Sequence, residues 1–357
     1  MEERTVQITG GSSYVITLPK GWSNRILERF QGSLEFKGER DEKHRLKGLR
    51  IQLIEQPDGS LIVSPHIQGT NIQSEKTINL EEISDENFLF RCLIGAYIAG
   101  HNRVIVSFTE QFPNWVHSVV RQYINQTIGQ EIVEETDKKV VIKDLLNPSE
   151  MPFDKTITRQ SVIVRRMYTD IIDILKSKKY TIADDVLARD EDIDRLHWLI
   201  ARQYNSLLTN TYFRKKLKVP IAYATNIFLV SKIIERIGDH TVRIVKNIKY
   251  LLEEEEKSSS PFKLDGEVVN LLQDASEYAL NIFNNSIDSF LSKNLIHANT
   301  HIEEVKELYT KCDLLTSKIL VDEAKIAIAY GYIIESIRKI GDYAVDIAEN
   351  TVNALMS

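Results

Sequence analysis

Apolar residues recur at helical spacing through the C-terminal part of the chain, in two blocks separated by the polar segment 253–261. At about 100° per residue, Ile333, Ile337 and Ile340 fall on one side of a helix. The same spacing predicts six helices, over residues 158–175, 182–208, 220–252, 265–292, 297–321 and 323–356. We therefore expect two three-helix bundles, at residues 151–256 and 262–357.

The first 67 residues follow a different pattern, in which apolar and polar residues alternate over short stretches. Alternation with turn signals predicts strands, and a short amphipathic stretch predicts one helix over 22–30. The expected strands are 4–8, 13–18, 34–36, 49–54 and 60–63. Residues 1–67 are therefore expected to form a small β-rich domain with one helix.

Residues 68–150 mix both periods. Helical spacing covers 88–99 and 115–124, a β-branched run covers 103–108, and two further runs at 131–135 and 139–143 suit a hairpin. We expect a compact α/β connector here. The chain is thus mostly α-helical, with an α/β connector and a β-rich N-terminal domain.

A short motif occurs twice, about a hundred residues apart. Ile237-Gly238-Asp239 and Ile340-Gly341-Asp342 each follow an apolar run dotted with charges. A self-match of this kind indicates a duplicated helical unit.

Each copy carries acidic residues on one helix face. Like charges one turn apart destabilise a helix by a few tenths of a kcal/mol, a cost that a cation could offset. Oxygen-only ligands favour hard cations, here iron, manganese or magnesium. The candidate ligands are Asp190, Asp194, Glu235 and Asp239 in the first copy and Glu303, Asp342, Asp346 and Glu349 in the second. The alternative is that these faces are merely solvated.

The acidic motif resembles the PhoU family of phosphate-uptake regulators. The matching residues are Asp190-x-x-Ile193-Asp194-x-Leu196, followed by Leu229-x₅-Glu235-Arg236-Ile237-Gly238-Asp239-His240. The resemblance implies two three-helix bundles that bind metal ions or small metal clusters on their surface through these carboxylates. The second copy departs from the pattern, because Arg338 stands where the motif has Glu.

The N-terminal domain resembles AbrB/SpoVT-type swapped-hairpin domains, which form interleaved homodimers and bind DNA. The resemblance rests on residues 7–20, with Gly10-Gly11-Ser12-Ser13 and Leu18-Pro19-Lys20, and on Gly59-x-Leu61-x-Val63-x-Pro65. DNA binding requires neutralisation of phosphates by basic side chains. The candidates are Arg4, Lys20, Arg25, Arg40, Lys43, Arg45, Lys47 and Arg50. The alternative is a domain that only dimerises.

Composition narrows the choice of function. The 357 residues carry a net charge of −6, so any contact with DNA must be local. There is no apolar run of membrane-spanning length and no signal-peptide pattern, and we expect a cytoplasmic protein. Cys92 and Cys312 lack metal or redox spacing and are expected to be reduced and inert. No nucleotide-binding glycine motif occurs, and no nucleophile–base pair suggests an enzyme, although a carboxylate–metal phosphohydrolase is a remaining alternative.

The sequence thus predicts a modular regulator of phosphate uptake. We expect it to be a homodimer that binds duplex DNA at promoters of phosphate-transport genes, with the bundles as a metal-binding sensor. The alternative is a regulator that binds no DNA and acts through contacts with a transporter ATPase or a sensor kinase.

Overall fold

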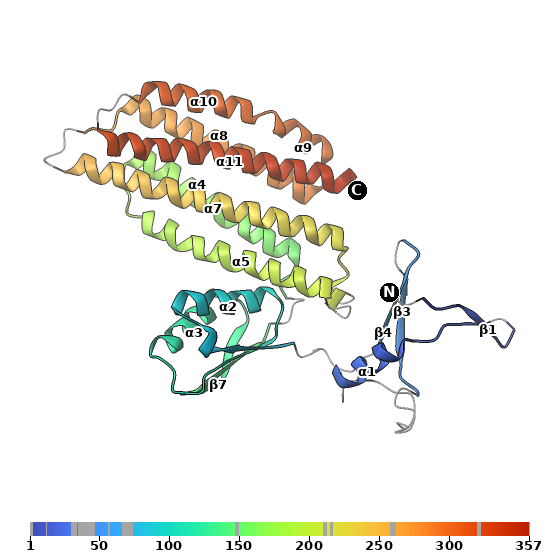
Figure 1. Cartoon of the computed structure of the whole chain (residues 1–357). Helices are drawn as coiled ribbons and strands as arrows, with labels where there is room; N and C mark the ends of the chain where they lie inside the picture. The colour runs from blue at the N-terminus through green and yellow to red at the C-terminus, as the bar shows by residue number, and fades with distance from the viewer. Residues whose placement is uncertain are drawn as a thin grey trace. The chain divides into compact units, whose positions relative to one another are not determined.

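A computed structural model describes most of the chain (Figure 1). The described residues are 3–11, 13–29, 34, 47–55, 58–65, 74–146, 150–209, 213–214, 217–257, 262–319 and 323–356. The chain divides into two compact units, Met1–Gln73 and Ser74–Ser357.

The first unit contains two antiparallel hairpins and one helix. Strands β1 (Gln7–Thr9) and β2 (Ser13–Val15) pair across Gly10 and Gly11, and helix α1 (Lys20–Arg29) follows. Both glycines have positive φ, which side chains with a Cβ rarely adopt. Strands β3 (Ile51–Glu55) and β4 (Leu61–Pro65) form the second hairpin. The small β sheets predicted at the N-terminus are confirmed.

This unit has almost no interior of its own. Among its described residues, Leu27 is the one buried apolar side chain. Large apolar side chains on both hairpins are exposed instead, with Ile8 at 69%, Tyr14 at 77% and Leu53 at 62%. The described residues of both hairpins therefore bury little apolar surface within the unit itself.

The second unit begins with a two-layer α/β module. Its elements are β5 (Glu75–Asn79), the 3₁₀ turn η1 (Leu80–Glu82), α2 (Glu86–Ile98), β6 (Arg103–Ser107), α3 (Trp115–Gln126), β7 (Gln130–Thr136) and β8 (Lys139–Asp144). The sheet order is β5-β6-β8-β7, with β5 parallel to β6 and the other pairs antiparallel. Helices α2 and α3 cover one face, where Val104, Val106 and Ile142 are fully buried. Both helices and the β6, β7 and β8 strands lie where the sequence predicts them.

Long helices form the rest of the second unit (Figure 1). They are α4 (Phe153–Ser177), α5 (Ala183–Thr209), α7 (Ile221–Glu256), α8 (Gly266–Ser292), α9 (Leu295–Ile302), α10 (Val305–Lys318) and α11 (Ala324–Met356). None of the described helices is long and apolar enough to cross a membrane.

One predicted helix is wrong in detail. Instead of a single helix over 297–321, the structure has α9 and α10, separated at Glu303 and Glu304. Helix α9 begins at Leu295 because the Asn294 side chain accepts a hydrogen bond from the His297 N–H. The spacing of apolar residues does not reveal this interruption, because Val305 and Leu308 continue the buried side of the helix.

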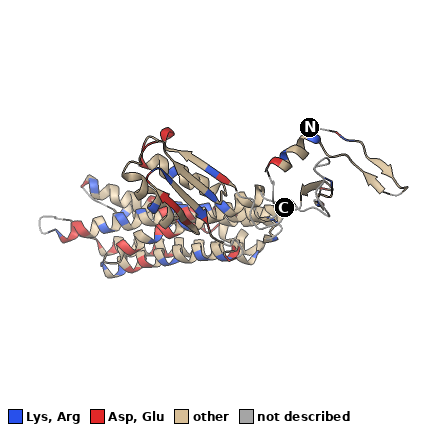
Figure 2. Cartoon of the chain, turned by 90° about the horizontal axis from the view of Figure 1, so that it is seen from below, with Lys and Arg blue, Asp and Glu red and all other residues tan. Residues whose placement is uncertain are grey.

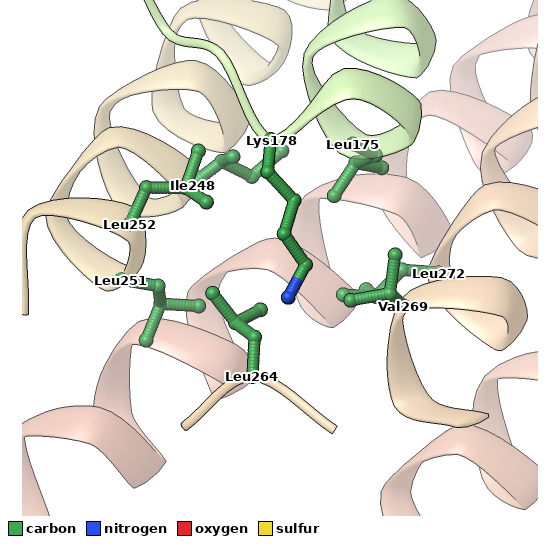
Figure 3. Close-up of a pocket in the computed structure, with 8 residues that line it drawn as sticks. All are labelled: Leu175, Lys178, Ile248, Leu251, Leu252, Leu264, Val269 and Leu272. Atoms are coloured by element: carbon green, nitrogen blue, oxygen red, sulfur yellow. The ribbon is translucent and has the colours of Figure 1, made fainter. Parts of the chain in front are cut away.

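The helices of both blocks share one apolar core rather than two. Helix α7 packs along α11, and α4 packs against α8 (Figure 1). The junction between the blocks is well filled: aliphatic side chains of α4, α7 and α8 close a small cavity around the Lys178 side chain (Figure 3). Lys178 ends α4 with positive φ, and its ammonium lies 3.4 Å from Glu255. The joined blocks are therefore one packed body.

The α/β module is attached to the bundle through α5. The Arg202 guanidinium, whose side chain is 7% exposed, donates to the Asp144 carboxylate at 2.5 Å and to the Tyr97 carbonyl at 2.6 Å. Asn205 donates to the Ile98 carbonyl at 2.9 Å. Because α5 also carries Asp190 and Asp194, one helix connects the candidate ligands to the α/β module.

Candidate carboxylate site

The site is built where α5 and α7 approach closely. The first Ile-Gly-Asp glycine permits this approach, because a Cβ on Gly238 would lie 2.9 Å from Ile193 Cδ1 and 3.2 Å from Asp190 Oδ1. The second motif glycine has the same role: a Cβ on Gly341 would overlap the end of the Leu308 side chain on α10. The repeated glycine is therefore a helix-packing residue that sets the acidic residues beside a second helix.

The structure brings the four carboxylates of the first copy together. Partial burial, then Asp239 and Glu235, raise the pKa of Asp190 to about 6. Burial, then Asp190, Glu235 and Asp239, raise the pKa of Asp194 to about 7. Asp194 thus lies within the field of the three other carboxylates, and Asp190 lies within the field of Asp239 and Glu235. A proton or a nearby cation would relieve the repulsion within such a cluster.

Two lysines supply part of the missing positive charge. The Lys232 ammonium lies 2.6 Å from the Glu235 carboxylate, and it lowers the pKa of Asp194. Lys246 lowers the pKa of Asp190. Partial burial raises the pKa of Asp239, and Lys232 and Arg236 oppose that effect. The first copy is therefore only partly neutralised by its own chain.

The donor set of the first copy has the chemistry of a hard-cation site, since all its ligands are carboxylate oxygens. Among the described residues, however, no three histidine, cysteine or acidic side chains are arranged so that they could hold a metal ion. The four carboxylates are neighbours, but they are not close enough to one another to hold a cation as they stand. The residues fit such an ion in chemistry, and their side chains must turn to bind it.

The structure contains a buried polar cluster beneath the site that the sequence analysis did not identify. The Ser231 hydroxyl donates to Gln160 Oε1 at 2.9 Å and lies 3.1 Å from His197 Nδ1, so α4, α5 and α7 are joined inside the core. Burial lowers the pKa of His197 to about 4. Polar residues at core positions of the predicted helices could have indicated this cluster, because buried polar groups require hydrogen-bond partners.

Two of the four acidic residues of the second copy, Asp342 and Glu303, already have partners. Asp342 accepts hydrogen bonds from the Tyr309 hydroxyl at 2.5 Å and from the Lys339 ammonium at 3.1 Å. Glu303 is exposed and pairs with Lys306. Arg338, at the Glu position of the motif, pairs with Asp313.

The second acidic stripe also lies near basic residues of α7. Burial, Glu349 and Asp342 raise the pKa of Asp346, and Arg236 on α7 lowers it. Arg243 of α7 lies over the Tyr332 ring of α11 at 4.2 Å. Acidic and basic residues are interspersed along the helical bundle (Figure 2). The second copy thus fits a cation less well than the first, because two of its four carboxylates are paired within the chain.

The DNA-binding candidates fall in the first unit. Of these, the described ones are all exposed: Arg4, Lys20, Arg25, Lys47 and Arg50. Arg40, Lys43 and Arg45 lie outside the described residues. The two cysteines are both free thiols; Cys312 is buried and Cys92 half-buried.

The helices that carry the four carboxylates of the first copy match a known domain. Residues 157–248, which span most of α4, all of α5 and most of α7, match the PhoU domain. The first bundle is PhoU-like. The resemblance predicted from the acidic motif is confirmed for this part of the chain.

Parts of the chain are also similar in sequence to individual PhoU homologs. A PhoU homolog of the phosphate-specific transport system from Caulobacter vibrioides is 28% identical over 151 residues, or 42% of this chain and 63% of that relative. PhoU homolog 1 from Thermotoga maritima is 22% identical over 210 residues, 55% of this chain and 82% of its own. The chain spans less than two-thirds of the Caulobacter relative's length.

Among solved structures, PhoU from Pseudomonas aeruginosa is similar in fold, with a TM-score of 0.48 and 15% identity. The match covers 57% of this chain and 95% of that structure.

Proposed function

We propose that this protein regulates phosphate transport, with the PhoU-like helices as its sensing part. One observation carries the proposal: the match at residues 157–248 contains all four carboxylates that α5 and α7 bring together. The relatives that share this region are named as accessory proteins of a phosphate-specific transport system.

The metal part of the proposal concerns the first copy. Asp190, Asp194, Glu235 and Asp239 would hold a hard cation such as iron, manganese or magnesium through oxygen ligands. A cation would supply the positive charge that the raised pKa values of Asp190 and Asp194 indicate is lacking. Glu303, Asp342, Asp346 and Glu349 would form a weaker site.

Replacing Asp239 with asparagine should reduce Mn²⁺ affinity by at least about tenfold, because a ligand is lost. The stability of the metal-free protein should stay unchanged or rise by a few tenths of a kcal/mol, since a like charge is removed. Calorimetric titration with Mn²⁺ and urea unfolding after chelation measure both effects. Asp137→Asn, in the exposed β7–β8 turn, is the control. Mn²⁺ binding that survives Asp239→Asn unchanged would rule out this site.

We further propose that the N-terminal unit binds duplex DNA as a homodimer. The exposed apolar side chains of both hairpins, Ile8, Tyr14 and Leu53 among them, support a partner surface, for which a second copy of the same unit is suited. The exposed basic residues support phosphate contact. The promoter of a phosphate-transport gene is the natural target of a regulator of this transport.

Lys20→Ala in the full-length chain is expected to weaken promoter binding and to reduce its salt dependence by about one phosphate contact per subunit. Fluorescence anisotropy at several salt concentrations measures both. Lys306→Ala, which removes the same charge from an exposed position on α10, should leave binding unchanged. If wild-type affinity for the promoter shows no salt dependence, the unit does not act on DNA and serves only for association.

If the helical bundle senses a signal, that signal must change the affinity of the protein for DNA. Mn²⁺ or phosphate should alter the promoter Kd about 5- to 150-fold, the usual range of allosteric coupling. Titration of the promoter fragment with and without each ion tests this. An identical Kd under all conditions would favour the second candidate, a regulator that acts by binding a transporter ATPase or a sensor kinase. That candidate draws support from the names of the relatives.

A further inference from the structure

The α/β module has an open groove of about 410 Å³ between the strand β5 and the helix α2. Its walls are mostly apolar or small: Ile78, Ile83, Phe88, Cys92, Gly95 and Ala99. A volume of this size is typical of ligand sites. The groove is remote in sequence from the carboxylates and from the basic N-terminal residues, and neither the DNA nor the metal proposal uses it.

The strand that borders the groove is an edge strand. In the part of the chain that the structure describes, β5 pairs with β6 alone, so its other side carries no strand. A free strand edge presents backbone N–H and C=O groups at regular spacing, and an added strand can pair with them. The groove therefore offers backbone partners to an extended chain as well as apolar surface.

Small residues of α2 line the helix side of the groove. Gly95 lies inside α2, is exposed, and has no atom within 4 Å of where its Cβ would be. A glycine inside a helix weakens it relative to alanine, and here no packing contact explains the choice. Ala99 continues the same exposed face one turn later. The face of α2 that docks on α5, through Phe90, Tyr97 and Ile98, is a different one.

The two acidic or basic residues that line the groove are separated along it: Lys76 lies near the start of β5, and Glu82 lies in η1, beyond the end of β5. Lys76 and Ile78 are two residues apart on β5, so their side chains lie on the same face as α2. His101, held by Ser74 at 2.7 Å, lies with Lys76 among the lining residues. A residue opposite Lys76 should therefore be acidic, and one two positions away, opposite Ile78, should be apolar and contact Phe88 and Cys92.

We propose that this groove binds an extended peptide segment of a partner protein as an additional strand on β5. The recognised segment has an acidic residue and an apolar residue separated by one position. The free strand edge favours a peptide over a small amphipathic acid, because only a peptide uses the backbone groups of β5. The proposal is independent of metal and DNA binding.

Selection of phage-displayed random peptides on the full-length chain tests the proposal, with Gly95→Leu as the counter-selecting variant. Enriched peptides should share the acidic–x–apolar pattern. A fluorescein-labelled synthetic copy should bind Gly95→Leu at least tenfold more weakly than wild type, and Gly95→Ala within about twofold, since leucine fills the groove and a methyl group does not. Lys76→Glu should reverse the preference between Asp and Lys at the first position.

Cys92 provides an internal reporter, because it lines the groove while Cys312 is buried. A maleimide should label Cys92 in the native chain, and saturating peptide should slow that labelling at least tenfold. Three results would overturn the proposal: no enriched pattern, equal binding to Gly95→Leu, or protection of Cys92 in the peptide-free native chain together with labelling in urea. The last would mean that the chain covers its own groove. Octanoate that protects Cys92 when no peptide is enriched would point to a small amphiphile instead.

Discussion

Replacing Arg202 with methionine is expected to lower the free energy of unfolding by about 3–5 kcal/mol. The substitution leaves the Asp144 carboxylate, 12% exposed, without its cation, and removes one of the hydrogen bonds to the Tyr97 carbonyl, which keeps the Gly100 N–H. A buried charge that loses its partner keeps its full desolvation cost. Urea unfolding followed by circular dichroism measures the loss.

An exposed ion pair provides the matched control. Lys306→Met removes the partner of Glu303, and both side chains are about 70% exposed, so the loss should be below about 1 kcal/mol. The double variant Arg202→Met with Asp144→Leu should recover a large part of the stability, because no charge then remains buried. Equal effects of Arg202→Met and Lys306→Met would show that α5 does not hold the α/β module through this pair.

Acidification from pH 7 to pH 4 should destabilise the protein by about 2–3 kcal/mol through His197 alone. Burial lowers the pKa of this imidazole from 6.5 to about 4 in the folded protein. The unfolded chain therefore binds a proton at His197 below about pH 6.5, whereas the folded protein binds it only below about pH 4. The stability that the neutral imidazole contributes is complete above pH 6.5 and is lost as the pH falls through this window.

His197→Gln separates this effect from other titrating groups. Glutamine can keep a hydrogen bond to Ser231 but carries no titratable proton. The difference in unfolding free energy between wild type and variant should change by about 2–3 kcal/mol between pH 7 and pH 4, whatever its value at pH 7. A difference that stays constant with pH would mean that His197 is protonated in the folded protein as readily as in the unfolded chain.

The sequence alone determined the local structure and one group of functional candidates. The spacing of apolar residues closely predicts the long helices, because each has one continuous buried stripe. These helices are α4, α5, α7, α8 and α11. The repeated glycine and acidic residues predicted that Asp190 and Asp194 would lie beside Glu235 and Asp239. Spacing places the acidic residues on one face of each helix, and the resemblance to the PhoU family implied that the two helices belong to one bundle.

Only the tertiary structure decided how these parts are joined. The shared core of the two blocks, the docking of α5 on the α/β module and the break between α9 and α10 depend on contacts between distant residues. So does the difference between the two acidic copies. The sequence around Asp346 does not indicate that Arg236 of another helix lies near it. Periodicity shows which side of a helix is buried, and carries no information on which helix covers it. A cation three residues away, such as Lys306 beside Glu303, can be identified from the sequence, whereas the effect of Arg236 on Asp346 depends on the packing of α7 along α11.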